Sequence, residues 1–334
     1  MYEGESFGYY KSIAGEVVFS TGMVGYPESL TDPSYAGQIL VMTYPLVGNY
    51  GVPEPSQWES SQIWVSGLVV SSYVDTPSYY SSTQTLREWL VAEKVPGVEI
   101  RDTRAIAKYL RETGAALGKL EVANKVDWYD PNKTNVVSDV STIKPEIFGN
   151  GNMTVVLIDC GAKRGIRQAL VDRGVKVVVV PWNFDLSKAS FSFDGVVISN
   201  GPGDPKMAKA TIATVKWLLG GEKALLGICL GNQILALAAG GDTYKLKYGH
   251  RSQNQPVGMR GSERCFLTTQ NHGFAVGKIP KGFEEWFINL NDKTNEGIRH
   301  KSKPFLSVQF HPEAKPGPVD TGFIFDDFVK LVRE

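Results

Sequence analysis

Cys229 occupies a sequence position in which a cysteine can act as a nucleophile. It lies in Gly227-Ile228-Cys229-Leu230-Gly231, between an apolar run that predicts a strand and a helical run over 232–239. Glycines on either side allow a strained turn that presents the side chain above a sheet. The N-terminus of the following helix lowers a thiol pKa, and its first N–H groups can bind an oxyanion. We therefore expect a thiolate nucleophile; the alternative is a buried structural cysteine.

A second run supplies the proton transfer that such a nucleophile requires. Phe310-His311-Pro312-Glu313 directly follows the predicted strand 306–310. A nucleophilic thiol needs a base, and the base needs an orienting group. Glu313 is two residues after His311, so its carboxylate can fold back onto the imidazole and fix the tautomer. His272, in a polar run that we expect to form a turn (270–274), competes for the role of base but lacks this carboxylate. The predicted triad is Cys229, His311 and Glu313.

The loop Asn200-Gly201-Pro202-Gly203-Asp204-Pro205 is a third candidate element of the site. Two glycines and two prolines in six residues exclude regular structure and favour a rigid loop with exposed N–H groups. Such a loop can hold an oxyanion or a substrate carboxylate, and a plain turn is the alternative. We find no Gly-Lys-Ser/Thr phosphate loop, dinucleotide fingerprint or cluster of metal ligands. The prediction is therefore no cofactor and no metal in this chain.

The elements that would position these residues alternate between strand and helix. Apolar runs that predict strands cover 154–159, 175–180, 194–199 and 224–228, and helical runs cover 164–172 and 206–219. This alternation predicts a doubly wound, mostly parallel sheet with helices on both faces. Sheets of this kind bind ligands at the carboxyl ends of their strands. Cys229 and the loop at 200–205 both follow such strands.

The first part of the chain predicts a smaller, strand-rich α/β domain. Strands are expected within 17–19, 38–43 and 63–70, and helices over 86–93 and 103–113. The polar, turn-rich sequence from about 122 to 153 predicts a linker. The predicted division is a first domain over 1–135, a linker over 136–152 and the catalytic domain over 153–334.

Composition excludes several classes of function. Lys plus Arg and Asp plus Glu both number 35 in 334 residues, so no overall charge attracts nucleic acid or an anionic membrane surface. Three cysteines without a close pair fit neither a disulfide framework nor a zinc site, which favours a reducing compartment such as the cytoplasm. The uncharged run 224–241 contains four glycines and is better explained as strand followed by helix than as a membrane span.

Together these motifs carry a family resemblance. The loop 200–205, the run 227–233, the cluster 270–274 and the run 311–313, in this order, resemble a class I, triad-type glutamine amidotransferase. The first half is similar to the N-terminal domain of the carbamoyl phosphate synthetase small subunit. The runs that carry this second likeness are Gly15-Glu16-Val17-Val18-Phe19, Gly25-Tyr26-Pro27-Glu28, Leu30-Thr31-Asp32-Pro33-Ser34-Tyr35, Thr43-Tyr44-Pro45 and Gly48-Asn49. Details at 22–27 and 295–298 look most like the glutaminase region of the fused eukaryotic pyrimidine-pathway enzyme.

The resemblance implies hydrolysis of L-glutamine to glutamate and ammonia. Cys229 would form a γ-glutamyl thioester, His311 would be base and then acid, and Glu313 would orient it. The family positions that contact glutamine or the oxyanion match Ser34, Gly201, Gly203, Leu230, Gln233, Asn271, Gly273 and Phe274. Ser34 belongs to the first domain, which would put the pocket at the domain junction.

The resemblance also implies a partner and leaves alternatives open. The ammonia would pass to a carbamoyl phosphate synthetase subunit or fused domain, where ATP and bicarbonate bind, in pyrimidine or arginine biosynthesis. A non-catalytic interaction or regulatory module is one alternative, although the Ser that marks the ammonia-dependent branch is absent at Cys229. A γ-glutamyl peptidase with the same triad is another.

Two positions depart from the family pattern. Asn232 stands where the family usually has His. Met1 falls where the family's first strand has already ended, so we expect a piece of a longer chain.

Overall fold

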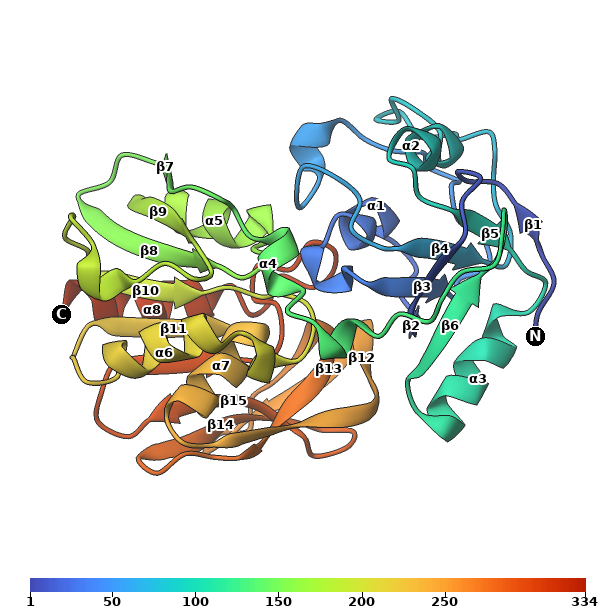
Figure 1. Cartoon of the computed structure of the whole chain (residues 1–334). Helices are drawn as coiled ribbons and strands as arrows, with labels where there is room; N and C mark the ends of the chain where they lie inside the picture. Colours follow the sequence, from blue (N-terminus) through green and yellow to red (C-terminus); the bar gives the residue numbers. More distant parts are fainter. The chain divides into compact units, whose positions relative to one another are not determined.

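The computed structural model describes residues 1–334, which form two compact units. The first unit comprises Met1–Thr134 and Lys247–Ser252, and the second comprises Asn135–Leu246 and Gln253–Glu334. Each unit has its own sheet and its own hydrophobic core (Figure 1).

The first unit is built on a six-stranded sheet. Its strands are β1 (Glu5–Ser6), β2 (Ile13–Ser20), β3 (Gln38–Met42), β4 (Gly67–Val70), β5 (Gly97–Glu99) and β6 (Ala116–Leu120), in the order β1-β5-β4-β3-β2-β6. Neighbouring strands from β2 through β3 and β4 to β5 are parallel, and β1 and β6 pair antiparallel at the edges. The carboxyl ends of four strands therefore lie at one edge of this sheet.

Helices cover both faces of that sheet. Its helices are α1 (Tyr26–Leu30), α2 (Leu86–Ala92) and α3 (Thr103–Thr113), with single 3-10 turns at Pro33–Tyr35, Pro55–Gln57 and Pro131–Lys133. Strand β3 is buried on both sides: Leu40 packs in one core with α2, and Val41 packs in a second core beside α3. Asp102 caps α3 by accepting a hydrogen bond from the Ala105 N–H. A cap at one end and Gly114 at the other explain why sequence alone predicts the bounds of α3.

The second unit contains a ten-stranded mixed sheet. Its strands are β7 (Glu146–Phe148), β8 (Met153–Asp159), β9 (Val175–Pro181), β10 (Gly195–Ile198), β11 (Ala224–Ile228), β12 (Asp242–Met259), β13 (Cys265–Lys278), β14 (Phe283–Asn289), β15 (Asn295–His300) and β16 (Phe305–Val308). The order is β13-β12-β14-β15-β16-β11-β10-β8-β9-β7. The central strands β16, β11, β10, β8 and β9 are mutually parallel, and β14, β15 and β7 pair antiparallel outside them.

Helices lie on both faces of the parallel strands. They are α4 (Val137–Val140), α5 (Arg164–Val171), α6 (Lys209–Leu218), α7 (Leu230–Ala238) and α8 (Phe323–Arg333), with 3-10 turns at Leu186–Lys188 and Pro205–Met207. Alternate residues of β8 belong to different cores: Val156 packs with α6 and α7, whereas Val155 packs with α5 and α8. The alternation follows from the two-residue period of a strand. The predicted α/β class, with a doubly wound parallel region, is confirmed.

Two regions differ from what local sequence patterns indicate. Residues 136–152, predicted as a linker, contain α4 and β7 and belong to the second unit, because β7 pairs with β9. The polar cluster 270–274, expected to form a turn, continues the 14-residue strand β13. Both segments are strands because they pair with other strands, β7 with β9 and β13 with β12, and local composition does not encode such pairing. No helix has the length and apolar character needed to cross a bilayer.

Candidate active site

Cys229 sits at a strained turn between β11 and α7. Its φ and ψ are 54° and −103°, a backbone conformation that a residue with a side chain rarely adopts. The Cys229 N–H donates to the Val308 carbonyl at 2.8 Å, which ties the turn to the neighbouring strand β16. Strain of this kind persists only where surrounding contacts enforce it, and it occurs at nucleophile turns.

Close packing explains the glycines on both sides of Cys229. A Cβ on Gly227 would lie 2.5 Å from the Gly231 carbonyl oxygen, and a Cβ on Gly231 would lie 2.1 Å from the Ile198 carbonyl oxygen. Neither distance allows a carbon atom, and the obstructing atoms are backbone. The turn therefore requires glycine at both positions.

The start of α7 offers a backbone donor beside the thiol. The Leu230 N–H makes no backbone hydrogen bond, as expected for the first residue of a helix. A Cβ on Gly201 would lie 2.8 Å from the Leu230 side chain and 2.1 Å from the Cys160 carbonyl oxygen. The loop after β10 and the start of α7 are thus in contact, so the two predicted oxyanion residues lie together. Gly203, two residues further on, has a φ of 80° that favours glycine.

The imidazole of His311 is held by Glu313 as the two-residue spacing predicts. The distance from Nδ1 of His311 to Oε1 of Glu313 is 2.6 Å, and both side chains are buried. The His311 N–H donates to the Thr269 carbonyl on β13 at 2.9 Å, which fixes the backbone at this point. With Nδ1 bonded to the carboxylate, the Nε2 atom is available for proton transfer. Nε2 is buried and makes no hydrogen bond to another protein atom, and the Cys229 side chain is one of the groups that raise the pKa of the imidazole.

Lys163 is a site residue that sequence reasoning missed. It comes from the loop between β8 and α5, its side chain is 2% exposed, and its Nζ lies 3.0 Å from Oε1 of Glu313. The same ammonium donates to the carbonyls of Ala314 and Lys315 at 2.9 and 2.7 Å. It therefore holds both the Glu313 carboxylate and the backbone that follows it. The available signal was position: Lys163 follows a strand of the parallel sheet, where ligand-binding residues gather.

The electrostatics of this group favour a charged His311–Glu313 pair. Burial by itself lowers the pKa of His311, but the Glu313 carboxylate and the Cys229 side chain outweigh it and raise that pKa above its usual value. Burial raises the pKa of Glu313, whereas Lys163 and His311 outweigh it and lower that pKa. The pair therefore stabilises an imidazolium, which is the state that accompanies a thiolate.

Four further predicted site residues lie on α7 and β13. Asn271 supplies its carbonyl oxygen to the Cys229 thiol at an Sγ to O distance of 3.6 Å. Gln233 donates to the Phe274 carbonyl at 2.8 Å and to Oε1 of Gln309 at 3.1 Å. Gly273 lies between Asn271 and Phe274 on β13. The structure thus brings this part of β13 against the thiol and the first turn of α7.

Asn232, the departure from the family pattern, lies in a buried polar network. Its amide donates to Oε1 of Gln309 at 3.1 Å, and its Oδ1 accepts from the Ser307 hydroxyl at 2.7 Å. Both partners belong to β16 and the residue that follows it. The asparagine therefore connects the first turn of α7 to the strand that leads to His311.

The competing residues are engaged elsewhere. The Nδ1 atom of His272 lies 2.8 Å from the Phe274 carbonyl and Nε2 lies 3.1 Å from Oε1 of Gln270, so both ring nitrogens already have hydrogen-bond partners. Cys160 is buried, and burial raises the pKa of its thiol. Cys265 is exposed at the start of β13. Ser34 lies in the 3-10 turn Pro33–Tyr35 of the first unit, where its N–H donates to Asp32, and its role stays a prediction.

A cysteine at a strained turn after a parallel strand, together with a buried His-Glu pair, is the arrangement of enzymes that use a thiol nucleophile. The family model "Glutamine amidotransferase class-I" matches residues 156–331, which is more than half of the chain. The model "Carbamoyl-phosphate synthase small chain, CPSase domain" matches residues 1–120. The chain belongs to the carbamoyl-phosphate synthase small-chain family, with a class I glutamine amidotransferase domain.

Relatives extend over the whole chain. The "Carbamoyl phosphate synthase arginine-specific small chain" of Saccharomyces cerevisiae is 46% identical, and the match covers 100% of this chain and 86% of that protein. The "Multifunctional protein CAD" of Squalus acanthias is 47% identical over 100% of this chain and 16% of its own length. The human mitochondrial "Carbamoyl-phosphate synthase (ammonia)" is 45% identical over 99% of this chain and 23% of its own length. The chain therefore spans less than a quarter of these last two relatives.

Proposed function

We propose that this chain is the glutaminase component of a glutamine-dependent carbamoyl phosphate synthetase. The observation that carries the proposal is Cys229 at a strained turn together with the buried His311–Glu313 pair, whose imidazole pKa the Cys229 side chain helps to raise. Family membership supports the substrate, because the matching domain is named for glutamine amidotransfer. The substrate is L-glutamine, and the products are glutamate and ammonia.

In the proposed first half-reaction, the Cys229 thiol transfers its proton to Nε2 of His311. The thiolate sulfur attacks the carboxamide carbon of glutamine, and the carbonyl oxygen becomes an oxyanion near the Leu230 N–H and Gly201. His311 then gives its proton to the leaving nitrogen, the carbon–nitrogen bond breaks, and ammonia departs. Glu313 keeps the imidazole in the required tautomer and stabilises the imidazolium, while Lys163 holds Glu313.

The second half-reaction reverses the same proton transfers. His311 accepts a proton from a water molecule, whose oxygen attacks the thioester carbon. The carbon–sulfur bond then breaks, and His311 returns its proton to the departing Cys229 sulfur. The result is glutamate and the original thiol. No cofactor in this chain is needed for either half.

The remaining predicted contacts concern the amino and carboxylate ends of glutamine. We propose that they are held by Ser34, Gly203, Gln233, Asn271, Gly273 and Phe274. Gln233 is buried and donates to the Phe274 carbonyl and to Gln309, so its proposed role requires that at least one of these bonds be exchanged for the substrate. Replacing Gln233 by Ala is expected to raise KM more than it lowers kcat.

The ammonia is proposed to pass to a synthetase partner that binds ATP and bicarbonate. Relatives named as small chains, and relatives in which this sequence is a fraction of a longer chain, support a separate or fused partner. We propose a cytoplasmic location and a role in pyrimidine or arginine biosynthesis. We propose that 1–135 form the first functional domain and that 153–334 carry the chemistry, with 136–152, which fold as part of the second unit, connecting them.

Glutamine hydrolysis by purified protein tests the proposal. The parent chain should release ammonia from L-glutamine, and Cys229→Ser and Cys229→Ala should not. Cys265→Ser, at an exposed cysteine, is the matched control and should keep parental activity. With a synthetase partner present, the Cys229 variants should still support carbamoyl phosphate formation from free ammonia. Full ammonia release by Cys229→Ala, or hydrolysis of γ-glutamyl peptides in preference to glutamine, would contradict the proposal.

A further inference from the structure

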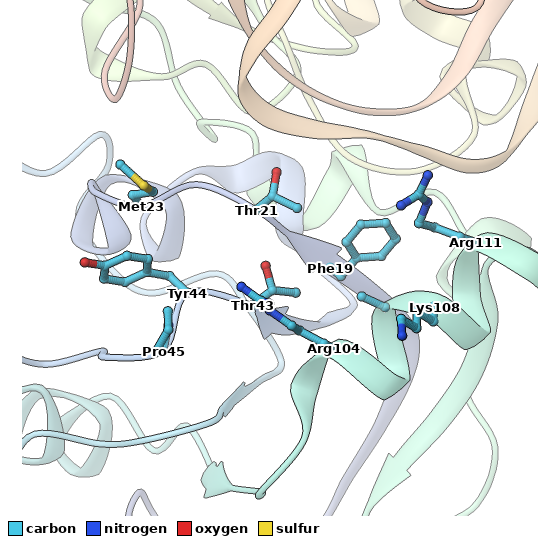
Figure 2. Close-up of a pocket in the computed structure, with 10 residues that line it drawn as sticks. Phe19, Thr21, Met23, Thr43, Tyr44, Pro45, Arg104, Lys108 and Arg111 are labelled. Carbon is cyan, nitrogen blue, oxygen red and sulfur yellow. The ribbon is translucent and has the colours of Figure 1, made fainter.

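The first unit contains a cavity that the proposed function does not use. Its volume is about 570 Å³, and it lies where β2 and β3 end and α3 passes over them (Figure 2). Volumes of roughly 300–1,000 Å³ are typical of sites for small molecules. Its position at the carboxyl edge of parallel strands is the position where open α/β sheets bind ligands.

Three cations of α3 line this cavity. Arg104, Lys108 and Arg111 follow one another at spacings of four and three residues, so they share one face of the helix. None of the three forms an ion pair or a side-chain hydrogen bond within the chain, and no acidic residue lines the cavity. Two acids of the same segment, Asp102 and Glu112, do not line the cavity, and Asp102 caps the helix by accepting from the Ala105 N–H. No carboxylate in the cavity wall therefore neutralises its positive charge.

The rest of the wall is apolar with a few hydroxyl groups. Phe19 is half-buried near the centre of the group that Figure 2 shows, with Met23 and Pro45 further along the wall. Thr21, Thr43 and Tyr44 add hydroxyl groups from the loops after β2 and β3. A ligand that fits this wall has a flat apolar body together with a strongly anionic group.

We infer that this cavity binds a small organic anion, of the class of phosphate esters carried on an aromatic or heterocyclic ring. The cations of α3 would contact the phosphate, and the apolar wall near Phe19 would cover the ring. A phosphate ion alone would leave the apolar wall uncovered, and an uncharged ring would leave the cations unpaired. The site requires both parts of the ligand.

Phenyl phosphate is the simplest probe of this class, and calorimetric titration of the full chain measures its binding. We expect one saturable site, with affinity about tenfold or more above that of inorganic phosphate or phenol alone. Raising the ionic strength should weaken the binding, because the cations are exposed to solvent. Absence of saturable binding, or equal binding of phosphate and phenyl phosphate, would overturn the inference.

Two variants with the same loss of charge locate the site. Arg104→Gln, Lys108→Gln and Arg111→Gln together should weaken phenyl phosphate binding by about tenfold or more. The control combines Arg101→Gln, Lys125→Gln and Lys133→Gln, which are exposed residues of the same unit outside the cavity, and should bind as the parent does. Lys108→Gln alone, an exposed helical substitution, provides a second variant that should fold and bind more weakly. Equal weakening in the control would show that only general charge is involved and would refute the assignment.

Discussion

Replacing Glu313 by Gln tests the electrostatic design of the site in a single substitution. The parent carboxylate accepts from His311 at 2.6 Å and lies 3.0 Å from the Lys163 ammonium, and all three side chains are at most 2% exposed. Glutamine keeps the shape and one carbonyl acceptor but removes the negative charge. It leaves the Lys163 ammonium in the interior without a counter-charge.

The expected loss of stability follows from that buried charge. Removing one partner of a buried ion pair costs about 3–5 kcal/mol. Lys163→Met should cost a similar amount, because it leaves the carboxylate and two carbonyls without their donor. The double variant carries neither charge, so its loss should be smaller than the sum of the single losses by about 1–3 kcal/mol. Urea unfolding of the four proteins, followed by circular dichroism, measures this coupling.

Activity should behave differently from stability in the same cycle. Without the carboxylate, the imidazole loses both its fixed tautomer and the charge that stabilises its protonated form. We expect kcat for glutamine hydrolysis to fall by about 10³–10⁴-fold in Glu313→Gln. The double variant's loss of stability should be smaller than the sum of the single losses, but its activity should be no higher than that of Glu313→Gln. A folded Glu313→Gln protein with kcat within about tenfold of the parent, or additive losses of stability, would refute this account of the triad.

Three further results are expected. Above pH 6.5, the free energy of unfolding should fall as pH rises, because His311, with its raised pKa, keeps its proton in the folded state after the unfolded chain has released it. Glu313→Gln should flatten this dependence, measured by urea unfolding at several pH values, and an unchanged slope would contradict the prediction. Gly231→Ala should abolish glutaminase activity and destabilise the fold by about 2 kcal/mol or more, because its Cβ would lie 2.1 Å from the Ile198 carbonyl oxygen. Gly221→Ala is the control: its Cβ would lie 3.4 Å from the nearest atom, so activity and stability should be near parental. Asn232→Ala should cost about 1–3 kcal/mol, measured by thermal unfolding, because it removes two buried hydrogen bonds, one to Ser307 and one to Gln309, although each of these groups keeps a second partner. A loss within error would show that these two bonds add nothing to stability.

Local sequence patterns predicted the parts of this fold that depend on local chemistry. The run 224–228 is β11 as expected, because five buried apolar or small residues precede a glycine-flanked turn. The bounds of α3 follow from its cap and its terminal glycine. The pairing of His311 with Glu313 follows from a spacing of two residues. In each case the determining contacts lie within a few residues of one another.

The features that the sequence did not reveal depend on distant contacts. Lys163 meets Glu313 across 150 residues of sequence, and nothing near either residue signals the ion pair. Strand β7 exists because it pairs with β9, although its own residues look like a polar linker. The cavity in the first unit likewise combines loops after β2 and β3 with a helix about 60 residues later. Contacts between residues that are far apart in sequence determine such features, so a short stretch of sequence does not predict them.

Covalent labelling by an electrophile that mimics glutamine tests the central claim most directly. The full chain is treated with the reagent, its glutaminase activity is followed, and the modified residue is located by mass spectrometry of peptides. The account predicts one equivalent of label on Cys229, with loss of activity in proportion to labelling and protection by L-glutamine. Label on Cys160 or Cys265, or complete labelling of Cys229 with activity retained, would contradict it.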